Sequence, residues 1–503
     1  MTPAHLSPLF TFVFFLGCFS PNEPINAEGG SETDEAGSSG GSAGTDVPTT
    51  TESGSSGSTA GTMPAESGDA TSMTDVTGDT TTTGEPVCGD GKVEGEEVCD
   101  DAVNDGSYGG CSDDCAELGP HCGDEAVQGS ENCDDGDADN GDGCNIDCTV
   151  SGEVVWNRTF SGAATAVAVD GENGLVVASS DSQYRKYGAQ GDPDWVEPYE
   201  VASATSTSGS AVAFDAVTGG WLVGGSAETV SQATNTWWRR FDDNGILGIG
   251  ATYDNADHTN DPLAGLAFDP DNNYYIALSI EDPDVLDDSD MALRKYSSAG
   301  ESLWSRTFDG GDDDVAHAVA VAPDGSVVVA GATEVAGQAF DSWIRKYDPE
   351  GATEWTRTSS GGGNVSDAIR AVAVGADGSI AAVGEESNDL WVRLYSAGGV
   401  AVWTEIYDGP ASGDIGYFSD QATCVAVDSA GAVVVGGTVL DGVSDFEPWL
   451  RKYRADGVVL WTAAPEADPD IAAFTNGIAV DSDDYVIVVG NDLNSGWITK
   501  YTP

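Results

Sequence analysis

Residues 343–355 read WIRKYDPEGATEW, and the recurrence of this phrase decides the fold. An apolar run ends in Arg-Lys-Tyr, a turn with Gly follows, and a Trp comes eight residues after the Tyr. Copies spaced 48 to 58 residues apart indicate a repeat protein. The ending returns at seven aromatic positions, which are Tyr187, Phe241, Tyr296, Tyr347, Tyr395, Tyr453 and Tyr501.

A second phrase alternates with the first and also occurs seven times. It reads AVAVAPDG from Ala318 and CVAVDSAG from Cys424, and an apolar strand such as SVVVAG (326–331) follows. Short β-branched runs between Asp, Gly and Pro turns are typical of β-strands. Each unit offers about four strands, the size of a propeller blade. The sequence therefore predicts an all-β domain over 151–503, a seven-bladed β-propeller.

The strand that carries the Trp predicts how the ring closes. A Trp lies eight residues after the aromatic in five copies, and Ile249 takes its place in a sixth. Tyr501 has no such strand after it, whereas residues 154–160 (VVWNRTF) hold Trp156 with no Tyr eight residues earlier. We expect 154–160 to complete the last blade, and a closed ring removes exposed sheet edges.

The first phrase also holds twelve of the seventeen basic residues of 151–503. Along 343–347, period-two alternation puts the Arg and the two aromatics on one face and the Lys on the other. The Arg residues would either form a cationic ring for an anionic ligand, or stack on aromatics and pair with a turn Asp of a neighbouring blade, such as Asp170 or Asp428. A residue present in nearly every blade serves each blade alike, which favours the structural role.

Charge limits the partners. The chain has 86 acidic and 18 basic residues, a formal net charge of −68 at pH 7. Nucleic acid and anionic lipid surfaces would be repelled over the whole molecule, so we exclude nucleic acid as a partner. The acidic residues are typical of a solvated surface on an exported protein, and they would also attract divalent cations.

The N-terminal segment indicates export. Residues 9–17 (LFTFVFFLG) form an apolar run of signal-peptide length, so we expect a signal peptide over 1–17. Residues 15–18 (FLGC) resemble the bacterial lipobox, which implies that Cys18 is lipidated and that acyl chains anchor the protein. The alternative is a cleaved, secreted protein. The rest of 18–86 is acidic, rich in Ser, Thr and Gly, and is expected to be a disordered linker.

Residues 87–150 form a duplicated cysteine module. The stretch CGDGKVEGEEVCDD from Cys88 is repeated in similar form as CGDEAVQGSENCDD from Cys122. An even number of cysteines in a small exported unit predicts disulfides, although four cysteines allow three pairings in each half. This sequence resembles the Cys-rich repeats of myxobacterial surface proteins, which implies a surface location. The predicted disulfide residues are Cys88, Cys99, Cys111, Cys115, Cys122, Cys133, Cys144 and Cys148.

Two metal hypotheses concern this module. The C-x3-C pairs would suit zinc, but the export context favours disulfides. Calcium prefers six to eight hard oxygen ligands, and residues 134–142 are crowded with them. The alternative is a set of exposed acidic turns. The candidate Ca²⁺ ligands are Asp134, Asp135, Asp137, Asp139 and Asp142.

Catalytic motifs with structural support are absent from the sequence. His258 and His317 are the two histidines of 151–503, and we place each in a turn that does not repeat. Cys424 takes an Ala or Gly position and is expected to be a small buried residue. The Y-x3-G-x3-W spacing of Tyr347, Gly351 and Trp355 resembles the repeat of quinone-dependent dehydrogenase propellers, in which the Gly and Trp dock neighbouring blades.

The function expected from the sequence is therefore binding. We expect a lipoprotein at the outer membrane or cell surface, attached to the membrane only by its lipid, whose propeller is a non-catalytic scaffold. Its partner would be an extracellular protein or polysaccharide, with Ca²⁺ as a candidate cofactor; the alternative is a quinone-dependent dehydrogenase. Function in propellers usually lies in loops that differ between blades, here 227–236, 280–290 and 408–421.

Overall fold

The computed structural model describes most of the propeller and part of the cysteine module; residues 1–91 lie outside it. The chain divides into two compact units, one ending at Gly119 and the other containing 120–503. No helix among the described residues is long and apolar enough to cross a membrane. Within 92–150 the described residues are scattered. Within 151–503 the structure describes all but 200, 202–203, 229–233, 254–259, 282–288, 312, 335–338, 362–364, 410–419, 441–445, 466–472 and 493–494.

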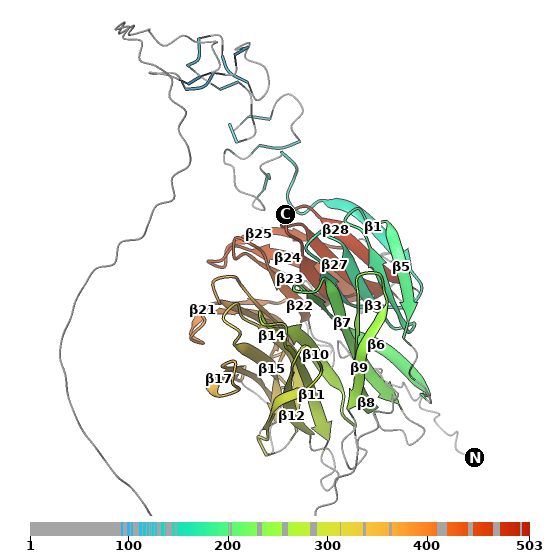
Figure 1. Cartoon of the computed structure of the whole chain (residues 1–503). Coiled ribbons are helices and arrows are strands. Elements are labelled where there is room, and N and C mark those ends of the chain that lie inside the picture. The colour runs from blue at the N-terminus through green and yellow to red at the C-terminus, as the bar shows by residue number, and fades with distance from the viewer. Residues whose placement is uncertain are drawn as a thin grey trace, which may run out of the picture. The chain divides into compact units, whose positions relative to one another are not determined.

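The described part of 151–503 is all-β and forms seven four-stranded antiparallel sheets (Figure 1). The first strands of successive sheets contact one another all the way round, from β2 through β6, β10, β14, β18, β22 and β26 back to β2. This confirms a closed, seven-bladed propeller. The strands, blade by blade, are β2 (Ala164–Val169), β3 (Leu175–Ser179), β4 (Gln183–Tyr187) and β5 (Pro193–Pro198); β6 (Ser206–Asp215), β7 (Gly220–Glu228), β8 (Thr234–Phe241) and β9 (Leu247–Tyr253); β10 (Leu263–Phe268), β11 (Tyr274–Glu281), β12 (Ser289–Tyr296) and β13 (Ser302–Phe308); β14 (Asp314–Val321), β15 (Val327–Glu334), β16 (Phe340–Tyr347) and β17 (Thr353–Ser359); β18 (Ala368–Val374), β19 (Ile380–Glu386), β20 (Asp389–Tyr395) and β21 (Ala401–Tyr407); β22 (Gln421–Val427), β23 (Val433–Leu440), β24 (Phe446–Tyr453) and β25 (Val459–Ala463); and β26 (Ala473–Val480), β27 (Val486–Asp492), β28 (Gly496–Tyr501) and β1 (Val154–Phe160).

The seventh blade is completed by the strand expected to close the ring. β1 pairs with β28 in the sheet order β1-β28-β27-β26, beside the C-terminus in Figure 1. Thr502 extends the closure beyond the sheet: its N–H donates to Glu153 O at 2.9 Å, and its hydroxyl donates to Val150 O at 2.6 Å. The N-terminal strand of the domain is thus held by the last residues of the chain.

Both faces of each blade are packed against neighbours, which explains the alternation along 343–347. Trp343 and Tyr347 lie in one core cluster with Tyr275 of the preceding blade. Ile344, one residue along β16, lies in another cluster with Trp391 of the following blade. The hydrophobic core is therefore distributed between the blades, and large aromatic side chains supply much of the buried area.

Six of the seven outer strands carry a Trp at the docking position, and Ile249 takes its place on β9. Trp355 Nε1 donates to Ala397 O at 3.1 Å, and Arg357 Nε donates to Gly399 O at 2.8 Å. Gly399 has a φ of +72°, and a Cβ built there would lie 2.6 Å from the Trp355 ring. The same Trp-to-Gly contact recurs between Trp156 and Gly191, Trp195 and Gly245, Trp403 and Gly457, and Trp461 and Gly152.

A matched pair of glycines tests this docking. Gly219 has the same φ of +72°, but an added Cβ meets no described atom within 4 Å. We expect Gly219→Ala to cost about 1–2 kcal/mol because of its left-handed backbone. Gly399→Ala should cost about 1–3 kcal/mol more, since its Cβ also displaces Trp355. Urea unfolding of both variants measures the difference; equal losses would contradict the docking role.

The cysteine module contains disulfides in both halves. Cys99 is bonded to Cys111, 12 residues later, and Cys133 to Cys144, 11 residues later. Both bonds join the second cysteine of a half to the third, which selects among the pairings that the sequence left open. Cys115 and Cys148 are disulfide-bonded as well. Cys88 and Cys122 lie outside the described residues.

Candidate functional site

The lysines of the repeated phrase hold turns of their own blades, and Lys186 also contacts Asp243 in a turn of the next blade. Lys452 Nζ lies 2.9 Å from Asp428 Oδ2, and both side chains are almost fully buried. Asp428 Oδ1 in turn accepts the N–H of Ala430 and of Ala432, so the carboxylate organises the turn between β22 and β23. The equivalent pairs are Lys186 with Asp170, Arg240 with Asp215, Lys295 with Asp269, and Lys500 with Asp481.

The arginines of the phrase stack on aromatic rings, as the structural interpretation predicted. The expected pairing of Arg with a turn Asp of the neighbouring blade is wrong, because the adjacent basic residue on the opposite face of the strand takes that Asp within the same blade. The shortest guanidinium-to-ring distances are Arg185 to Phe160 at 4.4 Å, Arg239 to Trp237 at 5.9 Å, Arg294 to Tyr253 at 4.0 Å, Arg345 to Phe308 at 4.5 Å, Arg393 to Trp391 at 4.7 Å, and Arg451 to Tyr407 at 4.6 Å.

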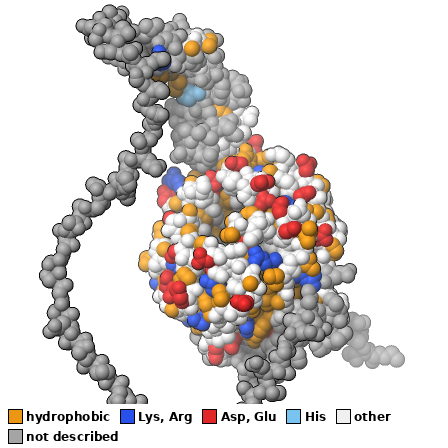
Figure 2. All heavy atoms as spheres, in the orientation of Figure 1, with side chains coloured by type: hydrophobic (Ala, Val, Ile, Leu, Met, Phe, Trp, Pro, Cys, Tyr) orange, Lys and Arg blue, Asp and Glu red, His pale blue; other side chains and the backbone are white. Residues whose placement is uncertain are grey.

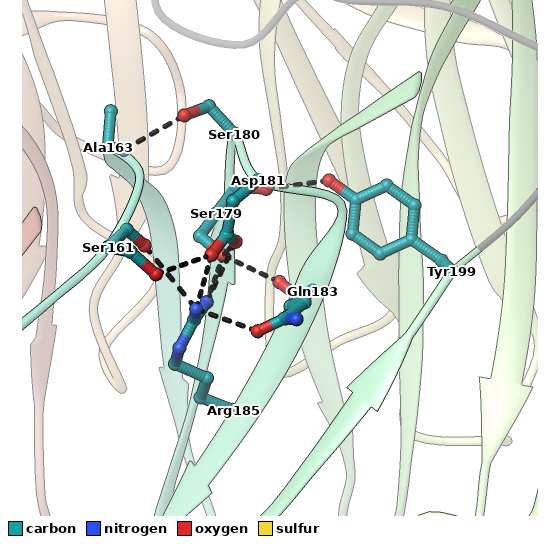
Figure 3. A network of polar contacts seen from close by, with 8 residues as sticks. All are labelled: Ser161, Ala163, Ser179, Ser180, Asp181, Gln183, Arg185 and Tyr199. Atoms are coloured by element: carbon teal, nitrogen blue, oxygen red, sulfur yellow. Dashed lines mark hydrogen bonds and ion pairs between the residues drawn. The ribbon is translucent and has the colours of Figure 1, made fainter. Parts of the chain in front are cut away.

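Arg185 shows how fully such a side chain is engaged (Figure 3). Its guanidinium binds Asp181 in the turn after β3 and Gln183 Oε1 at 2.8 Å, and it donates to Ser161 O at 3.3 Å. Burial acts to raise the pKa of Asp181, but hydrogen bonds from Arg185 and Ser179 outweigh it and hold that pKa below its usual value. This cation stabilises its own blade and is not available to a ligand.

The central channel is the best candidate for a functional site, because its lining differs from blade to blade. The first strand of every blade has a bulge against the second, and one residue at each bulge has no partner across the ladder. Bulges re-aim side chains and are frequent beside functional sites. All seven bulge residues line one cavity of about 190 Å³, and we call them the channel ring: Thr165, Ser210, Ala264, His317, Arg370, Thr423 and Asn476.

Hydrogen bonds link parts of the channel ring to the next blade. The Thr165 hydroxyl donates to Gly209 O at 2.7 Å, and the Thr423 hydroxyl to Thr475 O at 2.5 Å. Asn476 Nδ2 donates to Ala164 O at 2.7 Å, across the junction of the last and first blades. In each case the accepting carbonyl belongs to the residue just before the next bulge.

Blades four and five give the ring its ionisable groups. Arg370 Nε lies 3.0 Å from both carboxylate oxygens of Glu385, and Nη2 donates to Oε1 at 2.5 Å. Arg370 Nη1 lies 3.4 Å from His317 Nε2. Because a guanidinium has only donors, Nε2 must accept, which places the imidazole proton on Nδ1.

The structure corrects the expectation for His317, which lies on β14 and not in a turn. Its ring borders the channel, but the narrow surroundings deprive it of bulk water. Desolvation, followed by the positive charge of Arg370, lowers the pKa of His317 well below 6.5. The imidazole is therefore neutral at neutral pH.

This depressed pKa predicts acid sensitivity. Below about pH 6.5 the unfolded His takes up a proton that folded His317 excludes, so stability falls as pH falls. Relative to His317→Gln, the wild-type protein should lose up to about tenfold in its folding constant per pH unit below 6.5. Urea unfolding of both proteins between about pH 5 and pH 8 measures this; a difference independent of pH would contradict it.

The two faces of the propeller differ in their connections. The turns from first to second strand and from third to fourth strand have four or five residues in every intact copy. The connections on the opposite face range from two residues between β19 and β20 to thirteen between β21 and β22. We call the latter the variable face. The three loops singled out from the sequence belong to it, and the channel ring lies in the half of each first strand that starts there.

Acidic residues on this face include one close group. Carboxylate oxygens of Asp290, Asp309 and Asp314 lie within 4.8 Å of one another, and Asp290 ends one of the loops singled out from the sequence. In the cysteine module, Asp134 accepts the N–H groups of Gly123, Asp124 and Gly136 at 2.9–3.1 Å. The other candidate Ca²⁺ ligands, Asp135, Asp137, Asp139 and Asp142, lie outside the described residues.

The structure describes one of the remaining candidate residues. Cys424 is 5% exposed and lies on β22 next to the channel ring, which confirms a small buried residue. Cys18 and His258 lie outside the described residues. The channel ring itself was missed from the sequence, although each member directly precedes a copy of the second phrase, as His317 precedes AVAVAPDG.

Comparison with known proteins gives short or distant matches. No protein-family model matches the chain. The regulatory protein FlaEY of Caulobacter vibrioides is 33% identical over 116 residues, which cover 20% of this chain and 12% of that protein. The Dos1 propeller matches at a TM-score of 0.44 and 10% identity, covering 68% of this chain and 78% of that one. The WD40 propeller domain of Doa1 matches at 0.46 and 14%, covering 69% and 96%.

Proposed function

We propose that this protein is an exported surface lipoprotein whose propeller binds an extracellular protein or polysaccharide through its variable face. One observation carries the binding role: connections of very different length gather on a single face, while the other face repeats one short turn. Uniform turns serve the scaffold, and binding residues are disproportionately found on loops held by a rigid scaffold.

The surface charge supports this environment. Figure 2 shows Asp and Glu side chains in several separate places on the visible face of the propeller, among hydrophobic and other side chains. Scattered acidic groups with a net charge of −68 favour a soluble, solvated surface and disfavour nucleic acid. The disulfides of the cysteine module support an oxidising compartment outside the cytosol.

The dehydrogenase alternative has less support. The spacing that suggested it belongs to Gly and Trp positions that dock blades, as Trp355 docks on the Gly399 turn. These residues carry the fold, so their presence is explained without catalysis.

Site-specific photo-crosslinking on living cells tests the binding proposal. A crosslinking residue at Ser206 or Asn388 samples the variable face, and one at Val217 or Ala376 samples the uniform turns as a matched control. We expect adducts only from the variable face, since only its connections vary widely in length between blades. Adducts mainly from Val217 and Ala376 would contradict the proposal. Repeating the experiment with a chelator tests the Ca²⁺ requirement.

Cys18→Ala tests the anchor. Without the lipid we expect the protein to move from the membrane fraction to the medium or the soluble fraction, because acyl chains are its proposed attachment. Fractionation and immunoblotting measure this, with Cys424→Ala as the control. A Cys18→Ala protein that stays on the membrane would contradict lipidation.

A further inference from the structure

Arg370 keeps one edge of its guanidinium open to the channel. Glu385 occupies the edge formed by Nε and Nη2. The other partner among the described residues is His317 Nε2, at a long 3.4 Å from Nη1. The far edge, formed by Nη1 and Nη2, retains N–H groups, and the side chain is 23% exposed. Such a planar pair of donors matches the two oxygens of a carboxylate.

The geometry of Arg370 is fixed before any ligand arrives. Glu385 is 6% exposed and binds the guanidinium through more than one hydrogen bond, so the plane of the group is held. A preorganised donor loses less conformational freedom on binding.

Three other members of the channel ring offer hydrogen-bond acceptors. The hydroxyl protons of Thr165 and Thr423 are used on backbone carbonyls, so their oxygens offer lone pairs. Asn476 Nδ2 donates to Ala164 O and to Asn491 Oδ1, which leaves its own carbonyl oxygen as an acceptor. The Arg370 donors of blade five thus share the channel with the acceptor of the adjacent blade six and with those of blades seven and one, farther round the ring.

The volume of the cavity and the charges that line it limit which ligands it can hold. The cavity of about 190 Å³ is below the range of about 300–1,000 Å³ for drug-sized ligands, so the occupant is small. Arg370 and Glu385 cancel in charge, which suits one carboxylate better than a dianion. Acceptors opposite the carboxylate require O–H or N–H groups on the same molecule.

We propose that the channel ring binds a small monocarboxylate that carries hydrogen-bond donors, with Arg370 holding the carboxylate and Thr165, Thr423 and Asn476 accepting from the donors. A hydroxylated sugar acid and an amino acid share this chemistry. The site goes beyond the proposed surface role, because it requires neither a macromolecular partner nor a membrane anchor.

The ligand needs both a carboxylate and hydrogen-bond donors. Calorimetric titrations of the full-length protein with four probes test these two requirements separately. D-Glucuronate and L-serine carry both a carboxylate and donors, acetate has only the carboxylate, and D-glucose has only donors. We expect saturable binding of glucuronate, serine or both, which also identifies the class of ligand. Binding of neither, or equal binding of acetate or glucose, would overturn the proposal.

A paired substitution tests Arg370 without leaving Glu385 buried and alone. In the next blade, Thr423 and Thr438 occupy the positions of Arg370 and Glu385. The double variant Arg370→Thr/Glu385→Thr copies that pair, and circular dichroism verifies its fold. Binding should weaken at least about thirtyfold. The control is Arg454→Gln, which removes an exposed cation paired with Asp456. Unchanged affinity in the folded double variant would overturn the assignment.

Discussion

Deleting residues 154–160 from the full chain should abolish cooperative unfolding of the propeller. The deletion removes β1, which completes the seventh sheet, and exposes the edge of β28. It also removes Trp156, which packs in one core cluster with Leu175 and Ile498 of the two blades it joins. Loss of such a Trp alone costs about 3–5 kcal/mol, a large share of the roughly 5–15 kcal/mol that stabilises a domain.

Calorimetry of the deletion variant measures the effect. We expect a broad transition at lower temperature, with a van't Hoff enthalpy below the calorimetric enthalpy, because an open array of blades unfolds in parts. The unpaired edge should also promote aggregation. The matched control deletes seven residues, 50–56, from the Ser/Thr/Gly-rich segment and should leave the transition unchanged. A sharp transition at the wild-type midpoint in the 154–160 variant would contradict closure by β1.

The closure was predictable because it depends on a repeat. The phrase around Trp343–Trp355 occurs in every blade, so the absence of one half after Tyr501 and its presence at Trp156 identify the missing strand. Gly152, four residues before Trp156, completes the split copy, since the Trp461 ring packs on it as other Trp rings pack on their turn glycines.

The channel ring was not predictable by the same means. A bulge is a property of backbone pairing, and the seven bulge residues are of six different types, so they carry no repeated signal. His317 and Arg370 precede the same phrase 53 residues apart, but only the register shows that both face one cavity. The disulfide pairing was hidden for a similar reason, since spacing alone allows three arrangements.

The wrong prediction about the arginines has a geometric cause. Period-two alternation assigns residues to faces, but it does not say which face reaches the turn between the first and second strands. In the structure, the strand face that carries the Lys reaches this turn. The face that carries the Arg packs against aromatic rings and the neighbouring strand, as Arg345 Nε donates to Thr356 Oγ1 at 2.8 Å.

Lys452→Leu should be among the most destabilising single substitutions in the propeller, costing about 3–5 kcal/mol. Lys452 and Asp428 are 1% and 3% exposed, so removal of the Lys leaves a carboxylate buried without its counter-charge. Asp428 also holds the N–H groups of Ala430 and Ala432, and its displacement would loosen that turn. Urea unfolding at neutral pH measures the loss.

Blade five supplies the control. It has Gly375 at the Asp position and Leu394 at the Lys position, and Leu394 is 4% exposed within the core. The double variant Asp428→Gly/Lys452→Leu copies this natural arrangement, so it should recover most of the stability lost by Lys452→Leu. A buried ion pair replaced by apolar residues is often neutral, whereas a broken one is costly. Recovery would show that the basic residue of the phrase is needed only where a turn carries an Asp; a double variant as unstable as the single one would show that the Lys stabilises the blade by another route.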